Sequence, residues 1–325
     1  MRALIHQEFG PAEDVLTLED RPLPEPGPGQ VRLRIALSPI HNHDLWTIRG
    51  TYGFKPALPA ASGTEALGIV DALGEGVEHL AVGQRVASGG TFGVWAEYAL
   101  TNAAGLIPVP EALADEQAAQ LISMPFSAIS LLQFLDVAEG DWIVQNAANG
   151  AVGRMLAQLA AARGINVLGL VRRRDGIDEL RAQGIEHVVS TEDDDWRTQA
   201  TAITGGAPII AGVDSVGGDS SGDVLSLLAE NGTLVAFGAM NSPIMNISSG
   251  DVIFKQATVK GFWGSKVSQT MDAATRRALF GELIARVSEG SLTLPVAGVF
   301  DASDVADAVR ASNAPGRIGK VLLKF

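Results

Sequence analysis

Hydrophobic and polar positions divide the chain into two regions with different periods. Up to about residue 106, short alternating segments are interrupted by Gly and Pro, and they predict strands over residues 31–37, 68–73, 83–86 and 95–100. From residue 141 onward, apolar runs alternate with helical patterns, and the runs predict parallel strands over residues 142–147, 165–171, 187–190, 209–214, 232–237 and 258–262. The pattern therefore predicts an α/β fold in which a doubly wound parallel sheet follows an irregular β-rich domain.

Four further segments complete the predicted organisation. Helical spacing covers residues 113–135, 271–289 and 303–311, and a short strand is predicted over residues 296–300. We expect the part of the chain after residue 264 to pack back on the first domain. This places a catalytic domain at residues 1–112 and 265–325, and a nucleotide-binding domain at residues 113–264.

The most informative segment is WIVQNAANGAVG at residues 142–153. It combines a buried strand with a run of small residues, and a helix with one apolar face follows. Ala148, Gly150 and Gly153 have the spacing of G-x-G-x-x-G, with alanine at the first glycine. Such a turn lets a pyrophosphate approach the backbone at the positive end of a helix. We expect a dinucleotide here; the alternative is a glycine-rich helix start without a ligand.

The residues about twenty positions further on distinguish between the two nicotinamide dinucleotides. A fold that prefers NADH usually has an acidic residue there for the ribose 2′-hydroxyl. This chain instead has Arg172, Arg173 and Arg174 directly after a predicted strand. Guanidinium groups form charge-assisted bonds with a phosphate, so the sequence favours NADPH. The alternative is a solvated loop, although a basic cluster is unusual in a chain with 37 acidic and 24 basic residues.

The composition narrows the classes of protein and site. The formal net charge of −13 is unfavourable for binding nucleic acid. The chain has no cysteine, which excludes disulfides, a thiol nucleophile and zinc sites with cysteine ligands. No apolar run is long enough to span a membrane, and the first residues lack the features of a signal peptide, so a cytoplasmic location is expected.

Loops at the carboxyl ends of the predicted parallel strands are the expected place for ligands. The candidates for contact with the cofactor are residues of two such loops and a serine whose hydroxyl can orient a carboxamide: Val216, Gly217, Phe237, Gly238, Met240 and Ser127. Each is equally compatible with an ordinary turn or cap.

In the first domain, the candidate chemistry lies near two histidines and a tyrosine. His41 and His43, with acidic residues nearby, suggest part of a metal site, but in a strand such histidines would alternate between faces, and no third His or Cys is near in sequence. We therefore expect no metal ion. Tyr52 is one of only two tyrosines and lies in a Gly-bounded loop. It is either a packing residue or a proton donor or oxyanion partner.

Together these segments resemble the medium-chain dehydrogenase/reductase superfamily over essentially the whole chain. Within it, the chain looks most like the zinc-free 2-enoyl thioester reductases of the mitochondrial type, with the quinone oxidoreductases as near relatives. The motifs are IRGTYGFKPALPA, VQNAANGAVG, LVRRRDGI, DSVGG, FGAM and VIFKQATVKGFWGSK, of which the last is the most specific. The resemblance implies a Rossmann sheet inserted into a GroES-like catalytic domain.

The resemblance also implies roles for individual residues. Tyr52 matches the family's active-site tyrosine, although Arg49 replaces a glutamine. Arg172 and Arg174 match positions that meet the 2′-phosphate of NADPH, and Trp263 matches a tryptophan beside the cofactor and substrate. The expected catalytic residues are Tyr52, His41 and Trp263, and the expected cofactor-binding residues are Ser127, Asn149, Gly150, Ala151, Val152, Gly153, Arg172, Arg174, Val216, Gly217, Phe237, Gly238, Met240, Phe262, Trp263 and Lys320.

One departure from the family concerns the region where nicotinamide and substrate should meet. The family usually has P-I-N-P-S-D where this chain has P-I-H-N-H-D at residues 39–44. His41 is the second choice for the proton donor, after Tyr52, because an imidazole can donate a proton or reshape the pocket. The alternative is a tolerated packing change.

The implied activity is NADPH-dependent, metal-free reduction of an activated carbon–carbon double bond. The first-choice substrates are 2-enoyl thioesters: hydride reaches the β-carbon, hydrogen bonds stabilise the enolate, and the α-carbon is protonated. The alternatives are a quinone oxidoreductase or enone reductase, and a non-catalytic NADPH-binding sensor. The resemblance further implies a homodimer through the sheet edges at residues 232–262.

Overall fold

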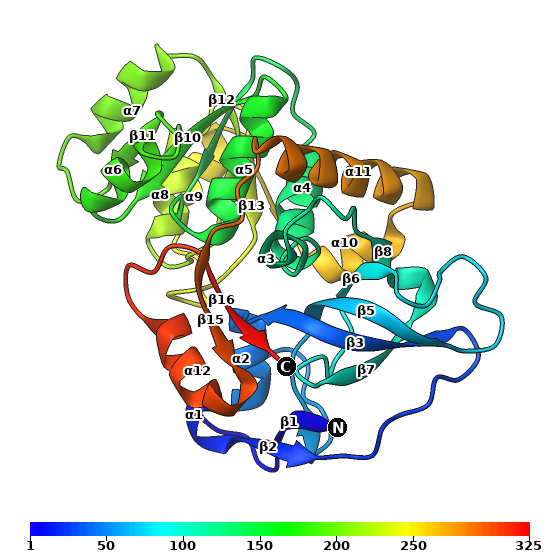
Figure 1. The fold of residues 1–325 in the computed structure, drawn as a ribbon. Helices are drawn as coiled ribbons and strands as arrows, with labels where there is room; N and C mark the ends of the chain where they lie inside the picture. The colour runs from blue at the N-terminus through cyan, green and yellow to red at the C-terminus, as the bar shows by residue number, and fades with distance from the viewer. The chain divides into compact units, whose positions relative to one another are not determined.

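The computed structural model describes all residues from Met1 to Phe325, and these form two compact units. The first unit contains Met1–Ser123 and Thr293–Phe325, and the second contains Met124–Leu292. The second unit is therefore an insertion into the first, as the chain colours in Figure 1 show. This confirms the predicted order of a β-rich domain, an inserted α/β domain and a return of the chain to the first domain.

A six-stranded parallel sheet forms the centre of the second unit. Its order is β11-β10-β9-β12-β13-β14. The strands are β9 (Trp142–Gln145), β10 (Asn166–Val171), β11 (Val188–Ser190), β12 (Ile209–Asp214), β13 (Thr233–Ala236) and β14 (Thr258–Gly261). From β9 the chain moves outward through β10 and β11, then returns to β12 and moves the other way. This reversal between β9 and β12 is where doubly wound sheets bind ligands, and the predicted doubly wound sheet is confirmed.

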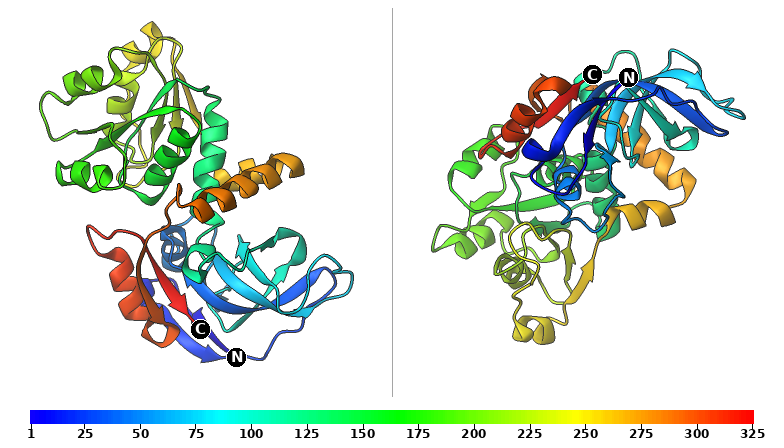
Figure 2. Two further views of the ribbon diagram at one scale, coloured as in Figure 1. Left: turned by 45° about the horizontal axis from the view of Figure 1, so that its top comes forward. Right: turned by 90° about the horizontal axis from the view of Figure 1, so that it is seen from below.

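Helices connect these strands and cover both faces of the sheet (Figures 1 and 2). They are α4 (Ser123–Leu135), α5 (Ala151–Ala162), α6 (Asp175–Arg181), α7 (Trp196–Thr204), α8 (Ser220–Leu227), α9 (Ser249–Phe254), α10 (Gly264–Thr270) and α11 (Ala273–Glu289). Val144, Leu168 and Leu234 are buried in the core between sheet and helices. No helix of the chain is long and apolar enough to cross a membrane.

The position of α11 changes the domain boundaries. Phe280 of α11 stacks on Phe126 of α4, with ring centroids 4.5 Å apart, and Glu282 forms an ion pair with Arg163 at 2.8 Å. The apolar face of this helix therefore has its partners within the second unit, not on the first domain as the sequence led us to expect. The boundaries lie at residues 123/124 and 292/293, whereas the sequence prediction placed them at 112/113 and 264/265.

Two sheets form most of the first unit. One has the order β2-β1-β4, and the other has the order β15-β16-β3-β5-β6-β8, with β7 also paired to β3. The strands are β1 (Arg2–His6), β2 (Leu16–Asp20), β3 (Gln30–Pro39), β4 (Ala60–Ala61), β5 (Glu65–Leu73), β6 (Arg85–Gly89), β7 (Tyr98–Asn102), β8 (Ile107–Pro108), β15 (Val296–Asp301) and β16 (Lys320–Lys324). The helices are α1 (Ala12–Val15), α2 (Asn42–Arg49), α3 (Asp115–Ala118) and α12 (Val305–Asn313), with short 3₁₀ turns η1 (Ala103–Gly105) and η2 (Ala302–Asp304).

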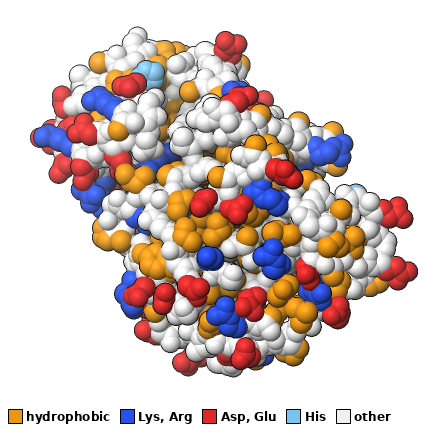
Figure 3. All heavy atoms as spheres, viewed as in Figure 1, with side chains coloured by type: hydrophobic (Ala, Val, Ile, Leu, Met, Phe, Trp, Pro, Cys, Tyr) orange, Lys and Arg blue, Asp and Glu red, His pale blue; other side chains and the backbone are white.

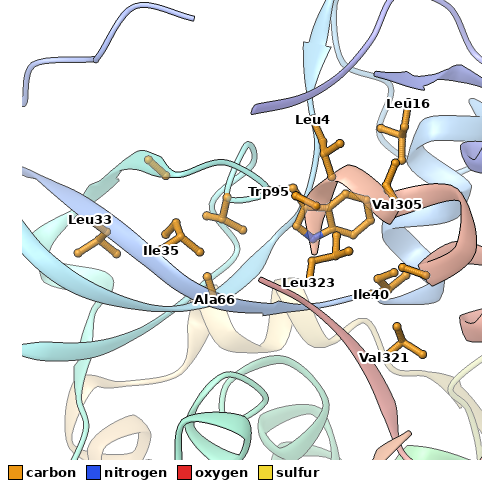
Figure 4. Close-up of a cluster of buried hydrophobic side chains, with 14 of the residues drawn as sticks. Leu4, Leu16, Leu33, Ile35, Ile40, Ala66, Trp95, Val305, Val321 and Leu323 are labelled. Atoms are coloured by element: carbon orange, nitrogen blue, oxygen red, sulfur yellow. The ribbon is translucent and has the colours of Figure 1, made fainter. Parts of the chain in front are cut away.

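The core of the first unit surrounds Trp95 (Figure 4). Its side chain is fully buried in one cluster with Leu4 near the start of the chain and Val305 and Leu323 near its end. Gly63 lies against the indole: its φ is +87°, and a Cβ there would lie 2.1 Å from the ring. Large-to-small changes at such a site cost about 3–5 kcal/mol. Trp95 therefore holds together the two chain segments that flank the inserted unit.

Helix α2 was not predicted from the sequence. His41 is its N-cap, and the Asp44 carboxylate accepts a hydrogen bond from the His41 backbone N–H at 3.0 Å. The helix ends at Gly50, whose left-handed φ of +75° suits a C-terminal cap. His43 therefore lies in a helix and not in a strand where the two histidines would alternate between faces, because the local capping bonds favour a helix.

Candidate functional site

The turn between β9 and α5 is shaped by small residues. Ala147 has a positive φ of 48°, and its carbonyl oxygen accepts a hydrogen bond from the Gly150 N–H at 2.8 Å. A Cβ on Gly153 would lie 2.7 Å from the oxygen of Ala147 and 2.8 Å from that of Ala148, so only glycine fits. Gly150 is the N-cap of α5 and has no side chain, which leaves the first N–H groups of the helix open to a ligand. The backbone bend lies at Ala147, one residue before the position expected from the motif.

A buried carboxylate holds the neighbouring loop. Asp214 ends β12 and is fully buried. Its Oδ1 accepts hydrogen bonds from Asn146 Nδ2 at 2.6 Å and from the N–H groups of Val216 and Gly217 at 2.9 and 3.0 Å. Its Oδ2 accepts from the Ser221 hydroxyl at 2.5 Å. Asn146 follows β9, so this network joins the two loops at the reversal point of the sheet. Sequence reasoning missed Asn146 and Asp214, although an amide and a carboxylate at the ends of two parallel strands were a usable signal.

Two glycines let the loops after β12 and β13 come close together. Gly217 has a φ of +76°, and a Cβ there would lie 2.1 Å from the carbonyl oxygen of Ser242. A Cβ on Gly238 would lie 2.8 Å from the carbonyl oxygen of Ser215. The close approach of the two loops therefore requires glycine at both positions, whether or not a ligand binds. The contact of these glycines with a cofactor stays a prediction.

A cavity of about 330 Å³ lies at the reversal point of the sheet. It is lined by residues from the turn after β9, the end of β10 and the loops after β12 and β13, among them Asn149, Arg172, Arg173, Val216 and Met240. All of these but Arg173 were predicted to bind the cofactor. The cavity thus gathers residues that are far apart in the sequence at the carboxyl ends of the strands, where such folds bind ligands.

The three arginines after β10 differ in their contacts. Arg172 lines the cavity and is in no ion pair, and Arg173 lines it beside Asp175, with both partners exposed and 3.2 Å apart. Arg174 is paired with Asp193 and does not line the cavity. Arg172 and Arg173 therefore lie at the cavity together with Asp175 and Asp223, whereas Arg174 is held by an acidic neighbour. On the face shown in Figure 3, basic side chains are scattered among acidic ones and form no continuous field.

The other predicted residues of the second unit lie outside the lining of this cavity. Ala151 and Val152 form the first turn of α5. Trp263 is 66% exposed and is the N-cap of α10. The Ser127 hydroxyl oxygen lies 3.6 Å from the position that a Cβ on Gly264 would take. Ser127 and the start of α10 are therefore neighbours, which brings together two predicted segments that are more than a hundred residues apart.

Part of the most specific sequence motif has a structural role. Phe262 is buried, with its ring centroid 5.8 Å from that of Phe237. Lys255 Nζ donates hydrogen bonds to the carbonyl oxygens of Leu225 and Ser226, at 3.1 and 2.7 Å, in the last turn of α8. Such bonds satisfy carbonyl groups that a helix end leaves without partners. The motif therefore stabilises the second unit, whatever else it does.

In the first unit, Tyr52 lies close to His43. Their ring centroids are 6.0 Å apart, and His43 in turn stacks on His41 at 4.9 Å. Tyr52 is half-buried, and burial raises its pKa above 10, so its hydroxyl stays protonated at neutral pH and can donate. The structure thus groups the two predicted residues around a third ring, that of His43, which was not among the predicted catalytic residues.

His41 is enclosed by protein. Its Nε2 lies 2.6 Å from Oε2 of the fully buried Glu65, whose Oε1 accepts backbone N–H bonds from Ile122 and Ser123 at 2.6 and 2.9 Å. Burial raises the pKa of Glu65 to about 7 and lowers that of His41 well below its ordinary value. The imidazole of His41 is therefore neutral at neutral pH. Because His41 is enclosed and contacts Glu65, it is better placed to hold Glu65 than to donate a proton to a substrate.

Lys320, the predicted cofactor residue at the start of β16, is also buried in the first unit. Its Nζ lies 3.5 Å from the carbonyl oxygen of Ile40. Burial, and to a smaller extent the charge of Arg317, lowers the pKa of Lys320 to about 8, and the carboxylates of Asp44 and Glu65 oppose this effect. Its contact with a cofactor stays a prediction.

The acidic groups near His41 are engaged by protein donors. Asp44 Oδ1 accepts from the Thr64 hydroxyl at 2.7 Å, and Oδ2 accepts from the His41 N–H. No group of three or more His, Asp or Glu side chains is placed to hold a metal ion. These residues form a hydrogen-bond network.

Comparison with known proteins gives matches along the chain. The family model described as alcohol dehydrogenase GroES-like domain matches residues 27–111, and the model described as zinc-binding dehydrogenase matches residues 151–279. The mitochondrial enoyl-[acyl-carrier-protein] reductase of Homo sapiens is 32% identical over 99% of this chain and 88% of its own length. The protein of the same name from Arabidopsis thaliana is also 32% identical, over 81% of this chain and 72% of its own length.

Two similar solved structures cover the whole chain. A putative NADPH:quinone reductase from Bacillus thuringiensis has a TM-score of 0.91 at 26% identity and covers 100% of this chain and 98% of its own. A mycobacterial protein complexed with NADPH has a TM-score of 0.87 at 26% identity and covers 100% of both chains.

The fold and the relatives define the class first: an oxidoreductase in which a Rossmann-like unit is inserted into a GroES-like unit. The chain belongs to the medium-chain dehydrogenase/reductase superfamily and is homologous to the mitochondrial enoyl-[acyl-carrier-protein] reductases. This confirms the family resemblance that the sequence motifs indicated.

Proposed function

We propose that this chain is an NADPH-dependent, metal-independent reductase of activated carbon–carbon double bonds. The observation that carries the proposal is the cavity at the reversal point of the sheet, which Arg172 and Arg173 line together with Asn149, next to the open N-terminus of α5. A helix N-terminus suits a pyrophosphate, and paired guanidinium groups suit a phosphate dianion. These donors fit NADPH better than NADH, which lacks the 2′-phosphate.

Several features of the second unit support binding of this cofactor. Gly150 and Gly153 allow the tight turn before α5, because a Cβ at either would lie within 3.0 Å of the carbonyl oxygen of Ala147. The buried Asp214 holds the loop that carries Val216, and the Ser127 hydroxyl is available to orient the carboxamide. When bound, the cofactor supplies the hydride, and the protein supplies orientation and electrostatics.

Fluorescence titration tests the choice of cofactor. NADPH should bind at least tenfold more tightly than NADH, because each hydrogen bond to a charged group contributes about 1.5–3 kcal/mol. Arg173→Ala should reduce this preference, while Arg174→Ala, a control that removes the same charge from a residue outside the cavity lining, should retain it. Equal affinity of the wild type for NADPH and NADH would refute the assignment.

A 2-enoyl thioester is the proposed substrate, with support from the identity of 32% over 99% of the chain to the human enoyl reductase. In this reaction hydride adds to the β-carbon, negative charge develops on the thioester oxygen, and the α-carbon takes up a proton. Tyr52 would stabilise that oxygen, because burial keeps its hydroxyl protonated and able to donate.

Replacing Tyr52 by phenylalanine tests this role. Loss of one donor to a developing oxyanion lowers turnover by about 100-fold or more, so kcat on the best substrate should fall to that extent while the affinity for NADPH is retained. Tyr98→Phe is a matched control, since Tyr98 is the other tyrosine and lies on β7. Wild-type turnover by the Tyr52→Phe variant would end the assignment.

Reduction of quinones or simple enones is the second candidate activity, because the similar Bacillus structure is named an NADPH:quinone reductase. The two activities are separated by steady-state assays with crotonyl thioester, benzoquinone and a simple enone, each with NADPH. A higher kcat/KM for the thioester supports the proposal, and a clear preference for the quinone overturns it. Treatment with a chelator should leave the activity unchanged if no metal takes part.

The proposal includes a homodimer formed through β14. This strand is at the edge of the sheet, and Val259 within it is 40% exposed. Phe254, at the end of the preceding helix α9, is 82% exposed. Unpaired strand edges with apolar side chains favour pairing with a second chain, and two identical edges can pair symmetrically. Light scattering should give the mass of a dimer for the wild type and of a monomer for Val259→Lys. A monomeric wild type would refute the proposed homodimer.

A further inference from the structure

We propose that His43, oriented by Thr64 and Asp44, is the proton donor of this reductase. The inference rests on the proposed reduction of an activated double bond and adds a catalytic residue, His43, and two positioning residues, Thr64 and Asp44. It replaces His41 in the role that the sequence suggested.

The hydrogen bonds around Thr64 determine which nitrogen of His43 carries a proton. Thr64 has one hydroxyl hydrogen, and its Oγ1 donates this to Asp44 Oδ1 at 2.7 Å. The same Oγ1 lies 2.7 Å from His43 Nε2. Because the hydroxyl hydrogen is already engaged, Nε2 must be the donor in the second contact. His43 is thereby held in one orientation with a hydrogen on Nε2, and Nδ1 becomes the nitrogen that gains or loses a proton.

The surroundings of Nδ1 allow such an exchange. No protein group is hydrogen-bonded to this atom, and it is not among the enclosed polar atoms that lack a partner. The side chain of His43 is 23% exposed, compared with 1% for that of His41. The ring of Tyr52, the predicted oxyanion donor, lies 6.0 Å away. Of the two histidines, only His43 has a ring nitrogen that is open for proton transfer.

One carboxylate lies close to the ring of His43. Asp44 Oδ1 is 3.7 Å from Nε2 and accepts the hydrogen bond of the Thr64 hydroxyl that positions this nitrogen. His41, stacked at 4.9 Å, is held neutral by its enclosure, so it adds no opposing charge. Tyr52 remains uncharged at neutral pH. The Asp44 carboxylate is thus the nearest of these groups to the ring, and the buried Lys320, whose pKa is lowered to about 8, interacts with the same carboxylate.

The proposed step moves one proton from His43 to the substrate. Bound NADPH would supply the hydride for the β-carbon, and the electron pair of the double bond would move into an enolate. The Nδ1–H bond of the His43 imidazolium breaks, its electron pair stays on the ring, and the proton forms the new C–H bond at the α-carbon. His43 is left neutral, with its remaining hydrogen on Nε2 and donated to Thr64 Oγ1, and it regains a proton from water at Nδ1.

His43→Gln provides the direct test, because the glutamine amide nitrogen can still donate to Thr64 but cannot titrate. The assay is NADPH oxidation with the best acceptor of the substrate panel over a range of pH. For the wild type, kcat should fall as the pH rises, because a proton donor must carry a proton before each turnover. The variant should lose about 100-fold in kcat and lose this inflection, while its affinity for NADPH stays within twofold. Unchanged kcat and an unchanged inflection would overturn the inference.

A second pair of variants keeps the inference testable if His43→Gln fails to fold. Thr64→Ser retains the hydroxyl and should retain the wild-type pH profile, whereas Thr64→Val removes it and should lower kcat about tenfold and move the inflection. Equal pH profiles of kcat for Thr64→Ser and Thr64→Val would refute the positioning role of Thr64. If the wild type reduces no acceptor, the proposed function fails as a whole; if it does and His43→Gln matches it, only the role of His43 fails.

Discussion

The pH dependence of stability tests the buried pair of His41 and Glu65. Burial raises the pKa of Glu65 from its ordinary 4.5 to about 7. Between pH 4.5 and pH 7, Glu65 is therefore more often protonated in the folded protein than in the unfolded chain. Glu65 contributes stability that is fully present below pH 4.5 and is lost as the pH rises through 7.

The magnitude follows from the two pKa values. The difference between them corresponds to about 3 kcal/mol. Between pH 5 and pH 7.5 the linkage relation gives about 2 kcal/mol of this. His41 acts in the opposite direction, because its lowered pKa gives stability that is present above 6.5 and lost as the pH falls. The effect of Glu65 must therefore be read from a comparison with a variant that keeps His41.

Glu65→Gln is that variant, since an amide oxygen still accepts the N–H bonds of Ile122 and Ser123 and the side chain no longer titrates. The assay is urea unfolding of both proteins at pH 5.0 and pH 7.5, followed by tryptophan fluorescence, because Trp95 is fully buried in the same unit. From pH 5.0 to pH 7.5 the wild type should lose about 2 kcal/mol relative to the variant.

Far-UV circular dichroism, recorded in parallel, shows whether the two units unfold in separate transitions. If they do, the comparison applies to the transition that exposes Trp95. A difference between wild type and variant that is the same at both pH values would refute the reasoning, since it would mean that Glu65 keeps one protonation state across this range.

Two further predictions concern the second unit. Gly217→Ala should raise the Kd for NADPH at least tenfold and lower the thermal midpoint, because a Cβ there would lie 2.1 Å from the carbonyl oxygen of Ser242. Calorimetry measures both quantities. Unchanged values would contradict the role of this glycine. Lys255→Met should cost about 1–3 kcal/mol of stability, because it removes two bonds to the end of α8, and should leave kcat unchanged; a loss of kcat in the folded variant would show a role beyond structure.

The sheet of the second unit was predictable because its signal is local. The strand Ile209–Asp214 was predicted at its observed bounds, since nearly all of its residues are apolar or small, as in strands buried on both faces. Helix α2 was not predicted, because it is short and depends on a bond between Asp44 and the backbone of His41. The place of α11 also required knowledge of tertiary contacts, since an amphipathic pattern shows that a helix has an apolar face but not what covers it.

The site was predictable only where it follows a turn motif. The glycines before α5 and the arginines after β10 lie at fixed distances along one strand-helix-strand unit, so their spacing is informative. The contacts of His43 with Thr64 join positions 21 residues apart and have no periodicity. Whether Arg173 or Arg174 lines the cavity depends on the direction of consecutive side chains, which a run of three identical residues does not reveal.

The pairing of β16 has a consequence for the order in which the protein is made. This strand, residues Lys320–Lys324, lies between β3 and β15 in the sheet of the first unit. During synthesis the inserted residues 124–292 leave the ribosome before it does, so that unit can fold while the sheet of the first unit still has a gap beside β3. The carbonyl of Ile40, next to His41, therefore meets Lys320 only after the inserted unit has been made. A chain that stops before Lys320 would lack the strand that lies beside β3 and the histidines.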